Sequence, residues 1–161
     1  MPVPFVRSWL DSVRRNHALE HATVAVLLAR HGPQRLAGRA AGDGFFFLGD
    51  VSSEELTDSA REALARLQRG EAGLAVSPLC GTNIAVAGLL AAAAATMSLS
   101  RGRGRFGNAF SAAVVGVVLS QPLGRLVQKY ITTRADLDGV EVIGTRDVLG
   151  GLRKVQTRAS K

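Results

Sequence analysis

Two histidines and a glutamate near the N-terminus have the types and spacing needed to bind a metal ion and move a proton. They are His17, Glu20 and His21, in an H-x-x-E-H pattern. On a helix, His21 lies about 40° from His17 around the axis and Glu20 about 60° to the other side, so all three project from one face. One divalent ion could meet both imidazoles, with the carboxylate as a base. The alternative is that the histidines cap or pack a surface helix and that Glu20 is a solvated charge.

The single cysteine, Cys80, is the candidate third ligand. It precedes a Gly-Thr-Asn sequence and a long apolar stretch. Two imidazoles and one thiolate form a zinc site with a fourth position open for water, whose proton Glu20 would accept. A cysteine at a helix start is also commonly a small buried hydrophobe. If Cys80 is not a ligand, the candidates for the third position are the carboxylates of Asp50, Glu54 and Glu141.

A helix over residues 9–31 would position the histidines. Apolar residues recur in this range at spacings of three and four, and Gly32-Pro33 is a typical helix end. His31 lies about 15 Å along the axis from His21, too far to share a metal. We therefore expect His31 to interact with the negative end of the helix dipole.

The polar part of the chain predicts further short elements. Residues 36–39 and 45–48 flank a turn-rich spacer and predict a β-hairpin. Ser52 and Glu55 form a capping box that opens a helix to about Arg69. These elements predict a small α+β part beside the histidine helix.

Two uncharged stretches, residues 84–99 and 106–123, predict a transmembrane helical hairpin. Each corresponds to about 25 Å of helix, at the lower limit for crossing a bilayer, and flanking residues extend both. The alternative is a pair of alanine-rich helices buried in a soluble protein. Small residues recur four apart on both stretches, at Gly88, Ala92 and Thr96 and at Ala112, Gly116 and Ser120. Such stripes allow close packing within the hairpin or in a homo-oligomer.

The predicted elements divide the sequence into three sections. Residues 1–80 are the cytoplasmic α+β part with the H-x-x-E-H helix, and residues 81–128 are the transmembrane hairpin. Residues 129–161 hold a short strand at 139–144 and a basic tail, which we expect to be frayed from Gly150 onward. The fold class is thus a mainly α membrane protein with a small α+β cytoplasmic part.

Charge and cysteine content narrow the partners and the compartment. Lysine and arginine total 20 against 13 acidic residues, so the net charge is +7. This charge suits anionic lipid headgroups, but the arginines are spread and no nucleic-acid motif is found, so we expect no nucleic-acid partner. One cysteine allows no internal disulfide and fits a reducing compartment. The first nine residues lack the apolar core of a secretory signal, so we expect an integral protein of the cell membrane with cytoplasmic termini.

The connection between the two apolar stretches leaves the membrane orientation open. Basic residues that flank membrane spans usually lie on the cytoplasmic side, and this connection and a second group after the hairpin are both basic. The connection carries Arg101, Arg103 and Arg105, and the second group is Arg125, Lys129 and Arg134.

Further short motifs follow the histidine pattern along the chain. They are P-L-C-G-T-N at 78–83, P-L-G at 122–124, Q-K-x-x-T-T at 128–133 and E-V at 141–142. Their order resembles an uncharacterised bacterial membrane family whose members are labelled predicted metal-dependent enzymes. The resemblance covers about residues 16–143 and implies that His17, His21 and Cys80 converge on a metal.

The chain departs from that family at two places. The family commonly has a lysine after the Glu-His pair and a proline after the Thr-Thr segment, where this chain has Ala22 and Arg134-Ala135. Larger members also carry extra membrane helices. These departures leave the substrate and the retention of activity open.

Together these observations predict a membrane-associated, zinc-dependent hydrolase, with a peptidase as the closest analogy for an H-x-x-E-H enzyme. Its ligands would be His17, His21 and Cys80, and Glu20 would be the general base. The alternative is a non-catalytic integral membrane scaffold or accessory protein with a structural metal site or none. A third hypothesis is a sensor of anionic lipid driven by the arginines. The expected partners are the lipid bilayer and a second copy of the chain.

Overall fold

The chain forms two compact units, which we describe separately. The computed structural model describes residues 3–100 and 106–159, and side chains from residue 6 onward. One unit comprises Met1–Val76 and Thr132–Lys161, and the other comprises Ser77–Ile131. The predicted connection with Arg101, Arg103 and Arg105 lies outside the described residues.

The first helix, α1, spans Val3–His31 and carries both histidines of the H-x-x-E-H pattern. It begins earlier than the predicted residue 9. It ends where predicted, because Gly32 takes a φ of 75° and its N–H reaches the carbonyl of Leu28 at 2.9 Å. The middle of α1 is buried in the core on nearly every side, through Ala18, Leu19, Ala22, Val26 and Leu27.

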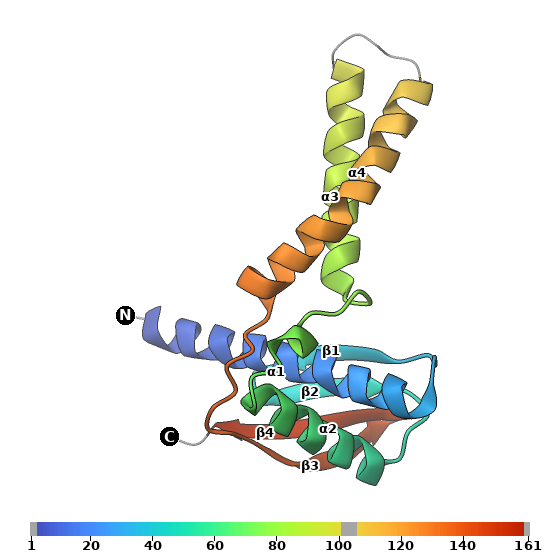
Figure 1. Cartoon of the computed structure of the whole chain (residues 1–161). Helices are drawn as coiled ribbons and strands as arrows, with labels where there is room; N and C mark the ends of the chain where they lie inside the picture. Colours follow the sequence, from blue (N-terminus) through green and yellow to red (C-terminus); the bar gives the residue numbers. More distant parts are fainter. Residues whose placement is uncertain (1–2, 101–105, 160–161) are drawn as a thin grey trace. The chain divides into compact units, whose positions relative to one another are not determined.

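The second helix, α2, spans Ser53–Gln68 and confirms the predicted capping box in its N-cap bond. The hydroxyl of Ser52 accepts a hydrogen bond from the N–H of Glu55 at 3.1 Å. Helices α1 and α2 pack against each other and against the sheet of the same unit (Figure 1). A short 3₁₀ turn, η1 at Ala72–Ala75, follows and contacts α1.

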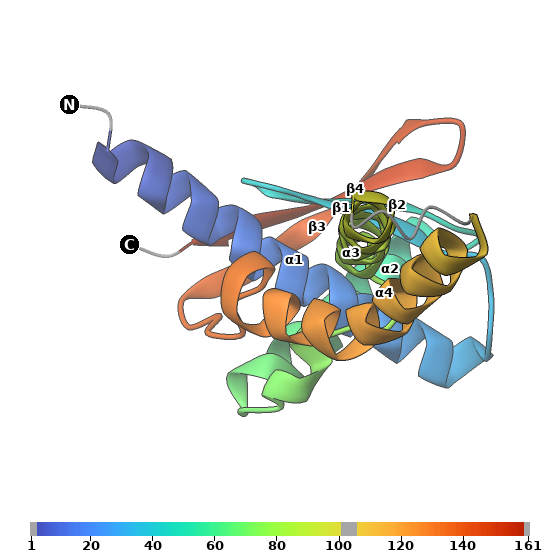
Figure 2. The ribbon, with the colours of Figure 1, turned by 90° about the horizontal axis from the view of Figure 1, so that it is seen from above.

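The sheet has four antiparallel strands in the order β1-β2-β4-β3. Strands β1 (Ala37–Ala41) and β2 (Gly44–Leu48) confirm the predicted β-hairpin. Strands β3 (Val140–Leu149) and β4 (Leu152–Ala159) form a second hairpin. Helices α1 and α2 both contact this sheet, and Figure 2 shows α1 running across it. Residues of both helices and of β2 and β4 form the hydrophobic core.

The expectation of a frayed tail from Gly150 onward is wrong. The tail folds back as β4, which is an interior strand paired with both β2 and β3. Gly150 and Gly151 make the turn, with φ values of 56° and 82° that other residues rarely adopt. Val155 of β4 is fully buried in the core. The predicted strand at 139–144 is the first half of β3.

A basic residue is buried in β4 because it has two partners. Lys154 is only 6% exposed, and its Nζ lies 2.6 Å from Oδ2 of Asp43 in the β1–β2 turn. The same ammonium lies 5.0 Å from the ring centroid of Phe46 on the neighbouring strand. The hydrogen bond from Lys154 holds the pKa of Asp43 below its ordinary value.

Asp43→Asn will destabilise the fold at neutral pH by about 1–3 kcal/mol, because the buried ammonium loses its charged acceptor. The pKa of Asp43 is lowered in the folded state, so the stabilisation is present above its unfolded pKa of about 3.9 and disappears as the pH falls through the folded pKa. Thermal unfolding of both proteins at pH 7 and near pH 3 measures this. Asp58→Asn, at an exposed pair, is the control. An equal difference at both pH values would contradict the prediction.

The second unit is a helical hairpin. Helices α3 (Gly81–Ser100) and α4 (Phe106–Val127) pack against each other, and a π-helical turn, η2 at Gln128–Thr132, follows α4. At Gly116, a Cβ would come within 2.9 Å of the backbone of Leu90, so glycine sets the closest approach of the helices.

Only one of the two predicted small-residue stripes lies in the interface of the hairpin. On α4, Gly116 and Ser120 are buried, and Gly124 extends the stripe by one turn. On α3 the packed face is rotated away from the stripe, so this stripe does not serve packing within the hairpin, and the alternative use in a homo-oligomer stays a prediction. The residues of the α3 stripe, Gly88, Ala92 and Thr96, are exposed.

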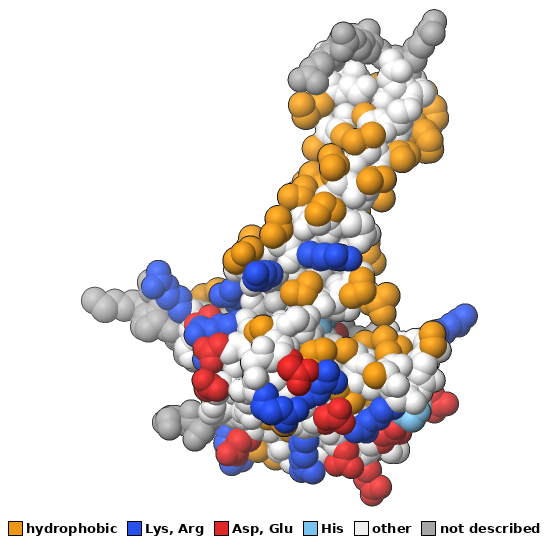
Figure 3. All heavy atoms as spheres, viewed as in Figure 1, with side chains coloured by type: hydrophobic (Ala, Val, Ile, Leu, Met, Phe, Trp, Pro, Cys, Tyr) orange, Lys and Arg blue, Asp and Glu red, His pale blue; other side chains and the backbone are white. Residues whose placement is uncertain are grey.

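The outer surface of the hairpin is apolar. By length and composition, Gly81–Ser100 and Phe106–Thr132 could each span a membrane, and only 6% of the first span and 17% of the second is buried. Figure 3 shows hydrophobic side chains along the hairpin, with charged residues concentrated on the rest of the chain. A core helix of a soluble protein would be mostly buried, so this exposure favours a lipid surrounding. Over both units, the described residues are mostly helical, with one small four-stranded sheet.

Candidate metal centre

The two histidines of α1 face the same side of the helix, as their spacing predicts. The centroids of the His17 and His21 rings are 4.4 Å apart, with an angle of 61° between the ring planes. His21 is buried with 4% exposure, and His17 is partly buried. One helical turn thus places two imidazoles within reach of one ion.

Both rings are held by the same kind of hydrogen bond. Nδ1 of His17 lies 3.0 Å from the carbonyl oxygen of Thr132, and Nδ1 of His21 lies 2.8 Å from that of Ala75. A carbonyl oxygen can only accept, so each Nδ1 carries a proton, and in the neutral form of each ring the lone pair lies on Nε2. Metal-binding histidines are commonly fixed in this way, with Nδ1–H on a backbone carbonyl and Nε2 on the metal.

The two acceptor carbonyls mark where the chain leaves the α+β unit and where it returns. Ala75 ends the 3₁₀ turn η1, one residue before this unit is left after Val76, and Thr132 is the first residue of the return. The Thr132 side is anchored further, since the N–H of Arg134 donates to the carbonyl of Arg14 at 3.0 Å. The histidine face of α1 therefore lies beside Ala75 and Thr132, two residues of its own unit.

Ion pairs secure the return segment on α1. Arg134 contacts Asp11 at 3.1 Å and Asp136 at 3.0 Å, and Arg15 reaches Asp136 at 3.2 Å. The hydrogen bond from Arg134 and that from the backbone of Asp138 lower the pKa of Asp136. These contacts hold the carbonyl that accepts from His17 in place.

Cys80 is the N-cap residue of α3. Its carbonyl accepts from the N–H of Asn83 at 3.0 Å, and its Sγ lies 3.4 Å from the N–H of Thr82. A helix N-terminus and a donated N–H both stabilise negative charge on sulfur. The cysteine is 7% exposed and follows Ala75, the acceptor for His21, by five residues.

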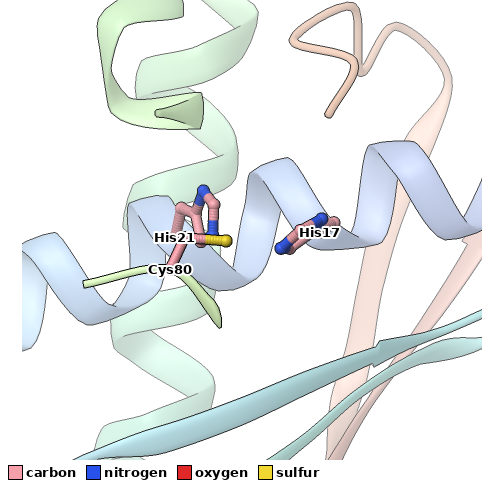
Figure 4. A group of neighbouring side chains, drawn as sticks. All are labelled: His17, His21 and Cys80. Carbon is pink, nitrogen blue, oxygen red and sulfur yellow. The ribbon is translucent and has the colours of Figure 1, made fainter. Parts of the chain in front are cut away.

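His17, His21 and Cys80 form one group of neighbouring side chains (Figure 4). Each offers one ligand atom, and these atoms all lie within 4.8 Å of one another. Two imidazole nitrogens and one thiolate are a donor set that suits zinc. The structure thus brings together the three residues that the sequence predicts as ligands.

Glu20 lies on the same helix but its carboxylate packs against strand β1. It is 7% exposed, and a Cβ on Gly38 would come within 2.2 Å of its Oε1. Among the residues that the structure describes, the ligand group contains the two histidines and the cysteine and not Glu20. Glu20 is therefore next to His21 along α1, but its carboxylate is held against strand β1.

The other candidate ligands from the sequence lie elsewhere. Asp50, Glu54 and Glu141 are exposed, and within residues 3–100 and 106–159 none of them joins the group. His31 stands in the last turn of α1, where it pairs with Glu55 of α2. Sequence reasoning missed the carbonyl acceptors, since backbone atoms carry no residue signature, although the Thr-Thr motif at 132–133 marks one of them.

Gly38→Ala will lower the thermal stability by about 1–3 kcal/mol, because the added methyl group overlaps the carboxylate of Glu20. Most of this loss will disappear in a Glu20→Ala background, since the smaller side chain leaves room for the methyl group. A double-mutant cycle of unfolding measurements gives the coupling. Gly73→Ala, where the space is open, is the control. Additive effects of the two substitutions would refute the contact.

Comparison with known proteins finds relatives of the chain. The family model for the domain of unknown function DUF6391 matches residues 12–145, a range that includes all three residues of the ligand group. An uncharacterised protein of Picosynechococcus sp. is 36% identical, across 84% of this chain and 72% of that relative. No solved structure matches.

Proposed function

The chain belongs to the family of the domain of unknown function DUF6391, and we propose that it is a zinc-binding protein of the membrane that acts as a hydrolase. The ligands would be Nε2 of His17, Nε2 of His21 and Sγ of Cys80. The observation that carries the proposal is the pair of Nδ1–H bonds to backbone carbonyls, which directs both Nε2 lone pairs away from the backbone. The sulfur of Cys80 supplies the third donor of the group.

The spacing of the donors suits a tetrahedral ion. Bond lengths of about 2.0–2.3 Å place donors about 3.3–3.8 Å apart around zinc. One ligand atom of each residue lies within 4.8 Å of the other two, so shifts of at most about 1 Å would bring these atoms to such distances. Three protein ligands leave a fourth position, which is the arrangement of catalytic rather than structural zinc sites.

Hydrolysis is the reaction class that this arrangement supports. Bound zinc supplies Lewis acidity, the chemistry with which three-ligand sites cleave amide and ester bonds. Glu20, one helical turn from His17, is the residue of this chain that would accept a proton from water. Burial of His21 and Glu20 excludes bulk solvent and strengthens the electrostatic interactions of both side chains. By analogy with H-x-x-E-H enzymes, the substrate would be a peptide bond.

A non-catalytic scaffold with a structural metal is the second candidate. The packing of the Glu20 carboxylate against Gly38 favours it, because a general base must reach the water that it deprotonates. Glu20→Gln separates the two candidates. If the protein is a hydrolase, the variant keeps its metal and loses hydrolytic turnover. If it is a scaffold, the variant keeps its metal and does not differ from the wild type.

We expect about one zinc per chain in protein purified in mild detergent without a polyhistidine tag. His17→Ala, His21→Ala and Cys80→Ala will each lose most of this metal, because removal of one donor of three leaves an incomplete site. Mass spectrometry of the metal content after zinc reconstitution measures it. His31→Ala is the matched control, since His31 is a histidine of the same helix outside the group. Equal zinc in all variants, or none in the wild type, would exclude the site.

We also propose that α3 and α4 insert in the lipid bilayer, with the termini in the cytoplasm. The support is the apolar and exposed surface of the hairpin. The glycine and serine residues on the α4 side of the interface let the two helices pack closely where the hydrophobic effect between helices is absent.

Membrane fractions will retain the chain after alkaline carbonate extraction, because the hairpin buries its outer surface in hydrocarbon. Val118→Arg, at an exposed position on α4, will reduce insertion, since a charge near the bilayer centre costs about 2.5–3.5 kcal/mol. Arg61→Ala on the exposed face of α2 is the control. Release of the wild type into the soluble fraction would rule out the proposed insertion.

A further inference from the structure

Two amide side chains form a buried polar network at one end of the hairpin. Gln128, in the π-helical turn after α4, is fully buried, and Asn83 in the first turn of α3 is 5% exposed. Nε2 of Gln128 donates to Oδ1 of Asn83 at 2.8 Å. Buried amides are costly unless they are hydrogen-bonded, so this pair has to be completed by further partners.

The further partners are backbone groups of the loop before Cys80. The N–H of Ser77 donates to Oε1 of Gln128 at 2.8 Å. Nδ2 of Asn83 donates to the carbonyls of Ser77 at 3.2 Å and Pro78 at 3.0 Å. All of the polar atoms of the two amides named here bond to each other or to this loop, and the loop is thereby tied to both helices.

The backbone of α4 is shaped to admit this network. A Cβ at Gly124 would come within 2.2 Å of Oδ1 of Asn83, so only glycine allows the helix to lie this close. The helix then widens into the π-helical turn that begins at Gln128. Such turns are frequent at functional sites, and in this one the amide of Gln128 bonds to the loop.

The tied loop leads directly to the sulfur of the ligand group. The N–H of Cys80 reaches the carbonyl of Ser77 at 3.4 Å, and the N–H of Thr82 reaches the cysteine Sγ at 3.4 Å. Ser77 is thus bonded to both amides, and its carbonyl also accepts the hydrogen bond from the N–H of Cys80. The position of Sγ follows from the position of this loop.

We infer that Asn83 and Gln128 are positioning residues of the metal centre, which fix the loop 77–80 so that the thiolate of Cys80 is held ready for the ion. This inference rests on the proposed function, since it assumes that Cys80 is a ligand. Partners that orient a metal ligand commonly change metal affinity by 10–100-fold when they are replaced. A network that served hairpin packing alone would leave metal affinity unchanged.

Cobalt(II) is the probe that tests the inference, because a thiolate ligand gives it a sulfur-to-metal charge-transfer band in the near ultraviolet. We expect the full chain in detergent to show this band, and Cys80→Ala to lack it. Gln128→Leu will bind cobalt about 10–100-fold more weakly with a reduced band. Ser120→Ala is the matched control, since it removes a buried hydroxyl of α4 that bonds within its own helix, to Val117 at 2.6 Å.

A second variant covers the case in which Gln128→Leu does not fold. Asn83→Asp keeps the oxygen that accepts from Gln128 but loses the donor to the Ser77 and Pro78 carbonyls, and we expect it also to weaken cobalt binding by at least 10-fold. If a folded variant binds cobalt as the wild type does, with the same band, the inference is overturned while the metal site stands. If the wild type itself shows no sulfur band, the proposed ligand set fails and the inference fails with it.

Discussion

The hydrogen bonds from the two histidine Nδ1 atoms to backbone carbonyls are the interaction on which the proposed metal centre of this chain depends. They set the tautomer of His17 and His21, because an accepting carbonyl requires the proton on Nδ1. They also fix the ring orientations, which one helical turn alone would leave to side-chain rotation. The acceptors, Ala75 and Thr132, are the residues beside which the chain leaves and re-enters the α+β unit. The same contacts therefore orient the two proposed ligand nitrogens and hold both ends of the α+β unit against α1.

These contacts require a rigid α1, and the polar residues of its buried face supply that rigidity. Nδ2 of Asn16 donates to the carbonyl of Ala41 at 2.8 Å, and the hydroxyl of Thr157 donates to Oδ1 of the same asparagine at 2.7 Å. One side chain thus joins α1 to β1 and β4. Thr23, fully buried, returns its hydroxyl to the carbonyl of Leu19. A helix tied to two strands and packed on its apolar sides can hold two imidazoles without a bound ion.

The sequence could predict elements whose signals are local and could not predict contacts that depend on tertiary structure. Helical spacing placed His17 and His21 on one face, and the capping box at Ser52 defined the start of α2. The basic composition after Gly150 concealed an interior strand, because the partner that makes Lys154 tolerable, Asp43, lies more than a hundred residues away. The face of α3 that packs in the hairpin could not be predicted for a related reason, since small residues recur on several faces of an alanine-rich helix and only α4 decides which face packs.

The buried amides of the hairpin show the same dependence on distant partners and bear on what the proposed metal site would require. A cysteine at the start of a helix whose loop is not held in place could adopt several positions, and only one of them would suit the proposed site. Gln128 and Asn83 carry buried amides into a mostly apolar hairpin, which is unfavourable unless their polar atoms are paired. Apolar side chains would pack such a hairpin without that requirement. The amides add a fixed position for the loop before Cys80. A fixed loop is useful if Sγ of Cys80 has to be held at a set position for a metal ion.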